Sequence, residues 1–444
     1  MERLTANDAA FLDLEDEVSA MHSVTVATFE GPEPPADELA RRVAERTAAV
    51  PRLRQRLAEV PLDLARPLWI DDTEFDLDYH LRHTGLPSDP TTGDLANLVG
   101  RLLSQRLDRG KPLWELWIVS GLPDDRWAII SKVHYALVDG VSGADPLSMV
   151  IDQIRGVRSP KPWIPRPRPS QRRLLSDAAA TLVLDPFEQW RFVRRTFVDP
   201  IRSAAAHVTA GDDRGPFEGL TGAVGPHRRW HRITVDAADI AQLRDRHEVA
   251  TNDVVLALIT LGFRAMLATR DEPIPTSIRT LAPLAMATGD HFTNEISALE
   301  ADLPVGEADF DDVVRLIHEQ THHLSGTAKA VAGATLAELP GLVAPTLCGL
   351  GLRAATTVGA RLSDVQTVTV NAPGPGHEIS VLDRQMVELY PAMPLVSRVR
   401  VAVGVMSYRG RFGFGVTGDR DAGLEIAAMA NEIGRAAREA VVPL

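Results

Sequence analysis

The sequence contains very little cysteine. Cys348 is the one cysteine among 444 residues, so no disulfide can form within the chain. This composition fits a reducing compartment, and we expect a cytoplasmic location. The N-terminal segment MERLTANDAAFLDLEDE has neither a basic nor an apolar leader region, so no secretory signal is expected. No run of about 18 uncharged apolar residues occurs, which argues against a membrane-spanning helix.

Positive charge is also scarce. Lys plus Arg number 47 against 60 Asp plus Glu, a net charge of −13, so a nucleic-acid partner is not expected. One stretch differs: Arg155–Arg202 holds eleven basic and four acidic residues, with Trp163, Trp190, Phe192 and Phe197 among them. Basic residues with aromatics favour peripheral association with an anionic membrane or a lipid droplet. The alternative is that these arginines pair with the acidic remainder of the chain.

A proline-rich segment divides the chain. Pro160–Pro169 has five prolines in ten residues, which is typical of a stiff, extended linker. We therefore predict an N-terminal domain over 1–155, a linker and helix over 156–215, and a C-terminal domain over 216–444.

Helix and strand patterns alternate on both sides of this linker, which predicts an α/β architecture with helices covering the sheets. The predicted strands are Ser23–Phe29, Leu116–Gly121, Trp127–His134, Trp230–Val235, Thr276–Leu281, Ile296–Leu303, Thr367–Asn371 and Arg398–Tyr408. The predicted helices are Asp37–Ala49, Leu95–Leu107, Gly143–Arg155, Ala237–Glu248 and Thr251–Ala268. The small, apolar stretch Ala330–Leu362 fits either two buried helices or a mobile cover over a lipid chain.

The segment Ser131–Asp145 carries the most chemistry. A strand delivers His134, and Asp139 and Gly140 follow in a loop before a predicted helix. Imidazole titrates near neutral pH, and a carboxylate a few residues on can orient it or brace the loop, so the pattern suits acid–base catalysis. A structural histidine with satisfied hydrogen bonds is an equal alternative.

Several sequence blocks occur in one order along almost the whole chain. They are Asp8–Leu12 with Glu15, Leu107–Arg109, Pro112–Glu115, Asn252–Ala257, Ser277–Arg279, Asn294 with Ser297, Leu303–Pro304, Asn371–Pro375 and Met406–Gly410. On these blocks the chain resembles the bacterial wax ester synthase/acyl-CoA:diacylglycerol acyltransferase family. That family belongs with the CoA-dependent acyltransferases, whose mark is His-His-x-x-x-Asp-Gly.

The resemblance implies two chloramphenicol-acetyltransferase-like domains, each a mixed sheet with flanking helices, facing each other across a channel. It implies catalysis at His134 and residue 135, with Asp139 and Gly140 completing the motif. Tyr135 stands where the family has its second histidine, the general base. A phenol has a pKa of about 10, so only about one molecule in a thousand is deprotonated at pH 7.

The resemblance further implies that acyl-CoA and a lipid alcohol are the substrates, with triacylglycerol or wax ester as the product and no metal or organic cofactor. Asp139 would be structural and braced by a buried arginine, for which Arg279 is a candidate. The substrate-binding candidates are Asn252, Asp253, Arg279, Asn294, Asn371, Pro373 and Gly374. The expected location is the cytoplasm, either in solution or at the inner face of the membrane or on lipid inclusions.

Two other functions remain open. Tyr135 favours a homologue that binds lipid or acyl-CoA with impaired catalysis, and the acceptor could be another hydroxyl compound. His318-Glu319-Gln320-Thr321-His322 matches the H-E-x-x-H zinc signature. It lacks a third ligand block and lies within the acyltransferase resemblance, so a polar helix face is the favoured interpretation.

Overall fold

The computed structural model describes residues 2–61, 64–137, 146–152, 163–184, 219–270, 273–286, 295–327, 365–395 and 398–441. Its first six-stranded sheet has the order β12-β13-β2-β7-β6-β5. It contains β2 (His22–Glu30), β5 (Leu81–Gly85), β6 (Trp114–Leu122), β7 (Arg126–His134), β12 (Ser380–Val381) and β13 (Arg384–Ala392). The β5–β6 pair is parallel and the other pairs are antiparallel, so the sheet is mixed.

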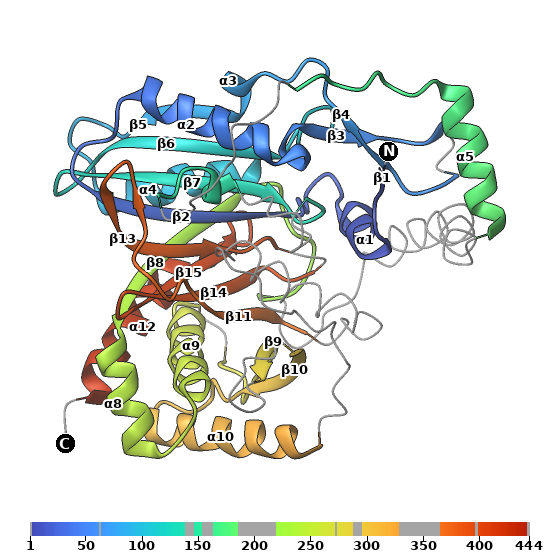
Figure 1. Ribbon diagram of the computed structural model, residues 1–444. Helices are drawn as coiled ribbons and strands as arrows, with labels where there is room; N and C mark the ends of the chain where they lie inside the picture. The colour runs from blue at the N-terminus through green and yellow to red at the C-terminus, as the bar shows by residue number, and fades with distance from the viewer. Residues whose placement is uncertain are drawn as a thin grey trace.

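Helices cover both faces of this sheet. Alternate residues of β2 point to opposite faces. Val24 and Val26 join the cluster that contains helix α4 (Thr92–Ser104), whereas Phe29 joins the cluster that contains α2 (Ala36–Ala49). Figure 1 shows this layer in the upper half of the molecule.

The second sheet has the order β10-β9-β11-β14-β15-β8. Its strands are β8 (Arg228–Asp236), β9 (Ile278–Met286), β10 (Glu295–Leu303), β11 (Thr367–Pro373), β14 (Val401–Tyr408) and β15 (Arg411–Asp419). β11 runs parallel to β9 and β14, and the remaining pairs are antiparallel. Below it lie α8 (Ala237–His247), α9 (Thr251–Ala268), α10 (Phe310–Thr327) and α12 (Ile426–Val441) (Figure 1).

Smaller elements flank the first sheet. β1 (Glu2–Arg3), β4 (Leu68–Asp71) and β3 (Gln55–Ala58) form a three-stranded sheet. Leu174 and Ala178 of α5 (Gln171–Leu184) pack against its apolar residues. The remaining elements are α1 (Ala6–Leu14), α3 (Leu77–His80) and the 3₁₀ turns Pro51–Arg54 and Pro146–Met149.

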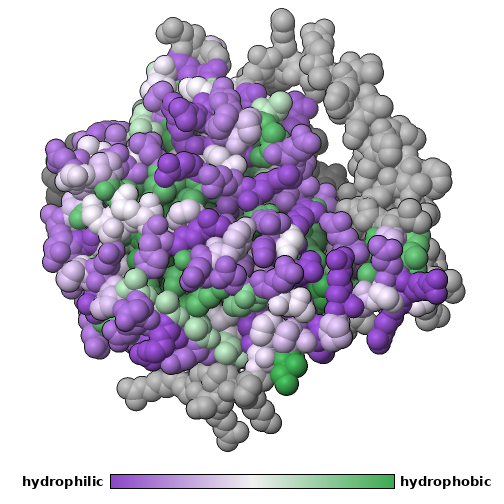
Figure 2. Space-filling model, turned by 90° about the horizontal axis from the view of Figure 1, so that it is seen from above, coloured by the Kyte–Doolittle hydropathy of each residue, from purple (hydrophilic) through white to green (hydrophobic). Residues whose placement is uncertain are grey.

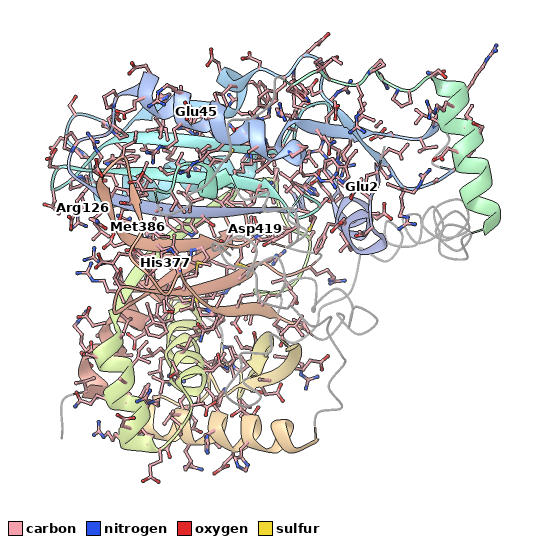
Figure 3. The ribbon with its side chains drawn as sticks, viewed as in Figure 1. Glu2, Glu45, Arg126, His377, Met386 and Asp419 are labelled. Carbon is pink, nitrogen blue, oxygen red and sulfur yellow. The ribbon has the colours of Figure 1, made fainter. Side chains whose placement is uncertain are left out.

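Strand β13 ties the two sheets together. It pairs with β2 in the first sheet and also contacts β14 and β15 of the second. Met386 of β13 and Arg126 of β7 lie at the same end of the first sheet, on either side of β2 (Figure 3). Gly415 of β15 lies so close to the Pro391 carbonyl oxygen that a Cβ atom would overlap it. The Trp230 indole N–H donates to that same oxygen at 3.2 Å. The close contact between β13 and β15 therefore requires a residue without a side chain at position 415.

We expect Gly415→Ala to lower the free energy of unfolding by about 1–3 kcal/mol, because the added methyl must push β13 away from β15. Urea unfolding at pH 7 measures this effect. Gly376→Ala is the matched control, since a Cβ there meets nothing within 4 Å, and it should stay within about 0.5 kcal/mol of wild type. Equal stability of the two variants would show that the contact between β13 and β15 tolerates a methyl group at position 415.

Helix α9 is the one described helix long and apolar enough to cross a membrane by length and composition. Most of it is buried against α8, α10 and α12, so packing in a protein core accounts for its apolar character. It carries Asp253 and Arg264, which agrees with the absence of a long uncharged run.

The structure confirms the predicted α/β fold and each predicted strand in position, to within a few residues. The helix predicted over Gly143–Arg155 is wrong in its described part, since residues 146–152 hold only a 3₁₀ turn over Pro146–Met149 and no α-helix. Asp152 then binds the segment to β12 and the turn after it, because its N–H donates to the Ser380 carbonyl and its carboxylate accepts from the Leu382 and Asp383 N–H groups. The domain boundaries stay a prediction, and the segment Ala330–Leu362 lies outside the described residues.

Candidate functional site

Strand β7 ends at the two residues that the sequence singled out. The His134 N–H donates to the Leu113 carbonyl, and the Tyr135 N–H donates to the Met21 carbonyl, each at 3.0 Å. A turn over residues 135–137 follows, closed by the Leu137 N–H on the His134 carbonyl. Because the backbone is still extended at His134, neighbouring side chains take different faces of the sheet.

The His134 ring uses both of its nitrogens. Nδ1 accepts the Ala136 N–H at 3.0 Å, and Nε2 lies 2.9 Å from a Glu15 carboxylate oxygen. An amide N–H can only donate, so the ring proton sits on Nε2 and is given to Glu15. The side chain is 1% exposed. In this arrangement His134 has no free lone pair for a substrate hydroxyl, and it acts as an anchor for the turn.

Glu15 follows α1, which lies at the end of the first sheet where β2 begins (Figure 1). Its carboxylate also accepts the Met21 N–H at 3.2 Å and pairs with Arg109 at 3.2 Å. Burial alone would raise the pKa of this carboxyl, but His134, then Arg109 and the Met21 N–H, lower that pKa from 4.5 to about 2. Sequence reasoning missed this pair, although Glu15 stands in one of the family blocks.

More buried basic groups lie behind His134. His22 is directly opposite it in the β2–β7 register, and Lys132 is two residues earlier on the same face. The Lys132 ammonium donates to the Gln105 carbonyl, and burial lowers its pKa to about 8. Burial, with the charge of Lys132, holds the pKa of His22 well below its usual value. His22 is therefore neutral at pH 7.

Tyr135 is fully buried among apolar side chains. The ring of Phe11 from α1 lies 5.3 Å from its ring, centre to centre. Asp139 and Gly140, the rest of the motif, lie outside the described residues, so the predicted channel near residue 135 stays a prediction. The described part of the site is thus an anchored histidine at the end of β7 and a buried tyrosine in the turn that follows.

Two candidates from the C-terminal half come together. The Asn371 amide of β11 donates to the Asn252 side-chain oxygen of α9 at 3.3 Å.

Asp253 has a local role, because its carboxylate accepts the Ala250 N–H and caps α9. The same carboxylate binds His318 at 2.8 Å and the Thr321 hydroxyl at 2.8 Å. His318 of the H-E-x-x-H sequence thus joins α10 to α9, and the described residues contain no cluster of three metal-ligand side chains.

The other candidates are scattered. Arg279 pairs with Asp302 at 3.0 Å, and its side chain is 41% exposed. The facing positions of these two residues in the β9–β10 register explain the pairing. Asp139 lies outside the described residues, so the bracing of Asp139 by Arg279 stays a prediction. Pro373 is exposed at the end of β11, and the Gly374 N–H donates to the Ser407 hydroxyl at 3.3 Å. Asn294 lies outside the described residues.

Comparison with known proteins identifies the family. The model of the wax ester synthase/diacylglycerol acyltransferase catalytic domain matches residues 4–255, more than half of the chain, and the model of the family's C-terminal domain matches residues 292–439. The chain belongs to the wax ester synthase/diacylglycerol acyltransferase family. A relative from Mycobacterium tuberculosis H37Rv, named probable diacylglycerol O-acyltransferase tgs1, is 30% identical over all of this chain and 96% of its own length.

Solved structures agree with this family fold. The wax ester synthase/diacylglycerol acyltransferase from Marinobacter aquaeolei VT8 superposes with a TM-score of 0.69 at 21% identity, covering 98% of both chains. The first condensation domain of the calcium-dependent antibiotic synthetase superposes with a TM-score of 0.56 at 13% identity, covering all of this chain and 96% of that one. At these identities the likeness concerns the fold. The two mixed sheets with flanking helices described above are therefore the family architecture.

Proposed function

We propose that the chain transfers a fatty acyl group from acyl-CoA to the hydroxyl group of diacylglycerol or a long-chain alcohol, giving triacylglycerol or wax ester. The observation that carries the proposal is the family match over both halves of the chain, which includes the strand that delivers the motif position. The relative named diacylglycerol O-acyltransferase, matched end to end, supports the same activity.

The chemistry needs a deprotonated hydroxyl oxygen to attack the thioester carbonyl. A new ester C–O bond forms, the C–S bond breaks, and the CoA thiolate takes up the proton that the hydroxyl lost. The thioester supplies its own activation, so the proposal needs no metal or organic cofactor. Glu15 and His134 hold the turn that carries residue 135, which is the base in the family motif. Here that residue is Tyr135, whose phenol makes proton removal slow at neutral pH.

An acceptor panel separates the candidate functions. Diacylglycerol, a long-chain alcohol and a short-chain alcohol are each offered with palmitoyl-CoA, and the ester product is identified by mass spectrometry. Ester formed with diacylglycerol or the long-chain alcohol supports the proposal. Ester formed only with another hydroxyl compound supports the alternative acceptor. Binding of palmitoyl-CoA without any ester supports the impaired homologue that Tyr135 favours.

We also propose peripheral association with an anionic membrane or a lipid droplet on the cytoplasmic side. In the described part of the basic stretch, Arg172 and Arg173 on α5 and Ile164 are exposed, Ile164 by 82%. Arg166 instead pairs with Asp71 at 3.3 Å. The face in Figure 2 is mostly hydrophilic with only narrow hydrophobic patches, so it is a poor membrane-docking face. Trp190, Phe192 and Phe197 lie outside the described residues.

We expect flotation with phosphatidylglycerol vesicles at low salt and loss of flotation at high salt, because exposed charges are screened. Arg172→Glu with Arg173→Glu should weaken flotation, whereas Arg41→Glu with Arg315→Glu, on α2 and α10, should not. Absence of flotation at low salt would rule out the membrane proposal and leave acyl transfer untouched.

A further inference from the structure

Helix α1 contacts both residues at the end of β7, one on each face of the first sheet. The Phe11 ring packs against Tyr135, and Glu15, which caps the C-terminal end of α1, binds His134. His134 and Tyr135 are neighbours in an extended backbone, so they point to opposite faces. Phe11 and Glu15 are about one helical turn apart, and α1 lies at the end of the sheet where β2 begins (Figure 1). One helix end therefore holds both side chains.

The backbone of residue 135 is fixed, but its side-chain torsions need a separate restraint. The Tyr135 N–H donates to the Met21 carbonyl at 3.0 Å, and the Leu137 N–H closes the turn on the His134 carbonyl at 2.9 Å. These bonds set the position of the Cβ atom. The Cα–Cβ bond still has three staggered orientations, and rotation about the Cβ–Cγ bond of an aromatic ring is broad. The side chains that pack on the ring must therefore select its orientation.

The Phe11 ring restricts both rotations. Its centre lies 5.3 Å from the centre of the Tyr135 ring, and the two ring planes are inclined by 32°. Aromatic rings at this separation are in contact. Both side chains are buried, Phe11 to 1% exposure and Tyr135 fully. The space on the α1 side of the Tyr135 ring is thus filled, and the ring cannot swing toward α1.

Phe11 is itself held in place. The Glu15 N–H donates to the Phe11 carbonyl at 3.2 Å, which ends the helix. The Arg109 guanidinium donates to the Leu12 carbonyl at 3.1 Å and pairs with the Glu15 carboxylate at 3.2 Å. Because Glu15 also binds His134, the last turn of α1 is fixed to the end of β7. The Phe11 ring is therefore a fixed wall beside residue 135.

We propose that Phe11 is a positioning residue for acyl transfer, which holds the ring of residue 135 so that its basic atom faces the acceptor hydroxyl. The inference rests on the proposed function, since residue 135 is the base of that reaction. A base acts only when its basic atom comes within about 2.6–3.2 Å of the group that loses the proton. Phe11 contributes no polar atom and acts through the ring that it contacts.

The two bases, phenol and imidazole, depend on Phe11 to different extents. A phenol oxygen lies on the Cβ–Cγ axis, so rotation about that bond does not move it. An imidazole nitrogen lies off this axis, so its position depends on both torsions. Loss of the Phe11 ring should therefore cost more activity in Tyr135→His, which has the base of the family motif, than in the wild-type chain. A side chain that only stabilises the fold would affect both chains equally.

Phe29 provides a matched control. It is fully buried in the same apolar cluster, and its ring stacks on Trp127 of β7 with 4.6 Å between the ring centres. Trp127 lies near the start of β7, at the other end of the strand from residue 135. Phe11→Ala and Phe29→Ala each remove a buried ring that contacts an aromatic residue at one end of β7, so both should lower the midpoint of urea unfolding. Phe11→Leu and Phe29→Leu are the milder pair if the alanine variants do not fold.

Steady-state turnover of palmitoyl-CoA by the full chain, with dioleoylglycerol and with hexadecanol, tests the proposal. Phe11→Ala should lower kcat about tenfold in the wild-type chain and about 100-fold in Tyr135→His, because a displacement of about 1 Å can cost about 10²-fold in rate. KM for palmitoyl-CoA should change less than twofold. Phe29→Ala should keep kcat within twofold in both chains, at a temperature where every variant is folded.

The rate at which the Tyr135 ring flips is a second measurement, and it needs no turnover. The chain has four tyrosines, so labelling with 3-fluorotyrosine gives few ¹⁹F signals, and Tyr135→Phe identifies the signal of Tyr135. Exchange between its two ring orientations should be at least tenfold faster in Phe11→Ala and unchanged in Phe29→Ala.

Faster ring flips together with a lower kcat in the Phe11 variant, and neither in the Phe29 variant, support the proposal. Unchanged ring flips, an equal loss of kcat in the wild-type and Tyr135→His chains, or an equal loss in Phe29→Ala would overturn it. Faster ring flips without turnover by any chain would contradict the proposed function alone, because Phe11 would still hold the ring of residue 135. Turnover with kcat unchanged in Phe11→Ala would contradict this inference alone.

Discussion

Tyr135→His should release CoA from palmitoyl-CoA about 10²–10⁴-fold faster than the wild-type chain in the presence of an acceptor alcohol. The substitution restores the residue that the family motif has at this position. A positioned general base contributes that range of rate enhancement, and imidazole has a pKa of about 6.5 against about 10 for a phenol. Burial disfavours the charged form of imidazole, which keeps the ring neutral and able to accept a proton.

The surroundings of residue 135 permit this change. Tyr135 is fully buried beside Phe11, and the smaller imidazole ring does not need more space. His134 cannot take over the role in the arrangement described, because Glu15 and the Ala136 N–H occupy both of its nitrogens.

Tyr135→Phe and the wild type are the comparisons, in steady-state assays of CoA release with folding checked by circular dichroism. His134→Ala is a further control that should lose activity through the turn. The prediction fails if Tyr135→His is no faster than Tyr135→Phe while both are folded. Loss of activity in both variants would instead give the Tyr135 hydroxyl a role of its own, and inactivity in all of them would favour a binding protein.

Glu15→Ala should lower the free energy of unfolding at pH 7 by about 3 kcal/mol. The substitution leaves the His134 Nε2–H and the Met21 N–H without an acceptor, and a buried donor left unpaired costs about 1–3 kcal/mol. Glu15 is 4% exposed. Urea unfolding measures the loss. Glu45→Ala is the matched control, because Glu45 pairs with Arg41 on the surface of α2 and is 58% exposed. That variant should change stability by less than about 1 kcal/mol.

The same carboxylate gives a pH dependence with a definite sign. Its pKa is about 2 in the folded chain and 4.5 ordinarily, so the unfolded chain binds the proton first as the pH falls. Its contribution to stability is full above pH 4.5 and is lost between about 4.5 and 2. The shift corresponds to about 3 kcal/mol. Glu15→Ala should remove this part of the acid sensitivity, and an unchanged slope between pH 5 and 3 would contradict the assignment.

Local patterning was sufficient to predict many of the elements. β-rich runs such as Ser23–Phe29 and Trp127–His134 appear as β2 and β7, and the apolar run of Thr251–Ala268 appears as α9. Which strands pair and which helices pack on them depends on tertiary contacts, and these cannot be predicted from the spacing of residues in the sequence. β13 comes from the C-terminal half of the chain and pairs with β2 of the first sheet, while Gly415 lets it pack closely on β15, and no periodicity reveals such a placement.

The candidate site likewise has features that the sequence predicted and features that it did not. The strand end predicted at His134 is confirmed, and Asn252 and Asn371 meet although 119 residues separate them. The Glu15–His134 pair, also 119 residues apart, is invisible to spacing because α1 is positioned by tertiary packing. The pairing of Arg279 with Asp302 was equally hidden from the sequence, because it follows from the antiparallel register of β9 and β10.

The most direct test of the central claim is the release of CoA from palmitoyl-CoA by the purified full chain, with and without dioleoylglycerol or hexadecanol. The account predicts release that depends on the acceptor and is matched mole for mole by triacylglycerol or wax ester, slow in the wild type and fast in Tyr135→His. No acceptor-dependent release from either protein, with both folded and binding CoA, would contradict the claim that this chain is an acyltransferase.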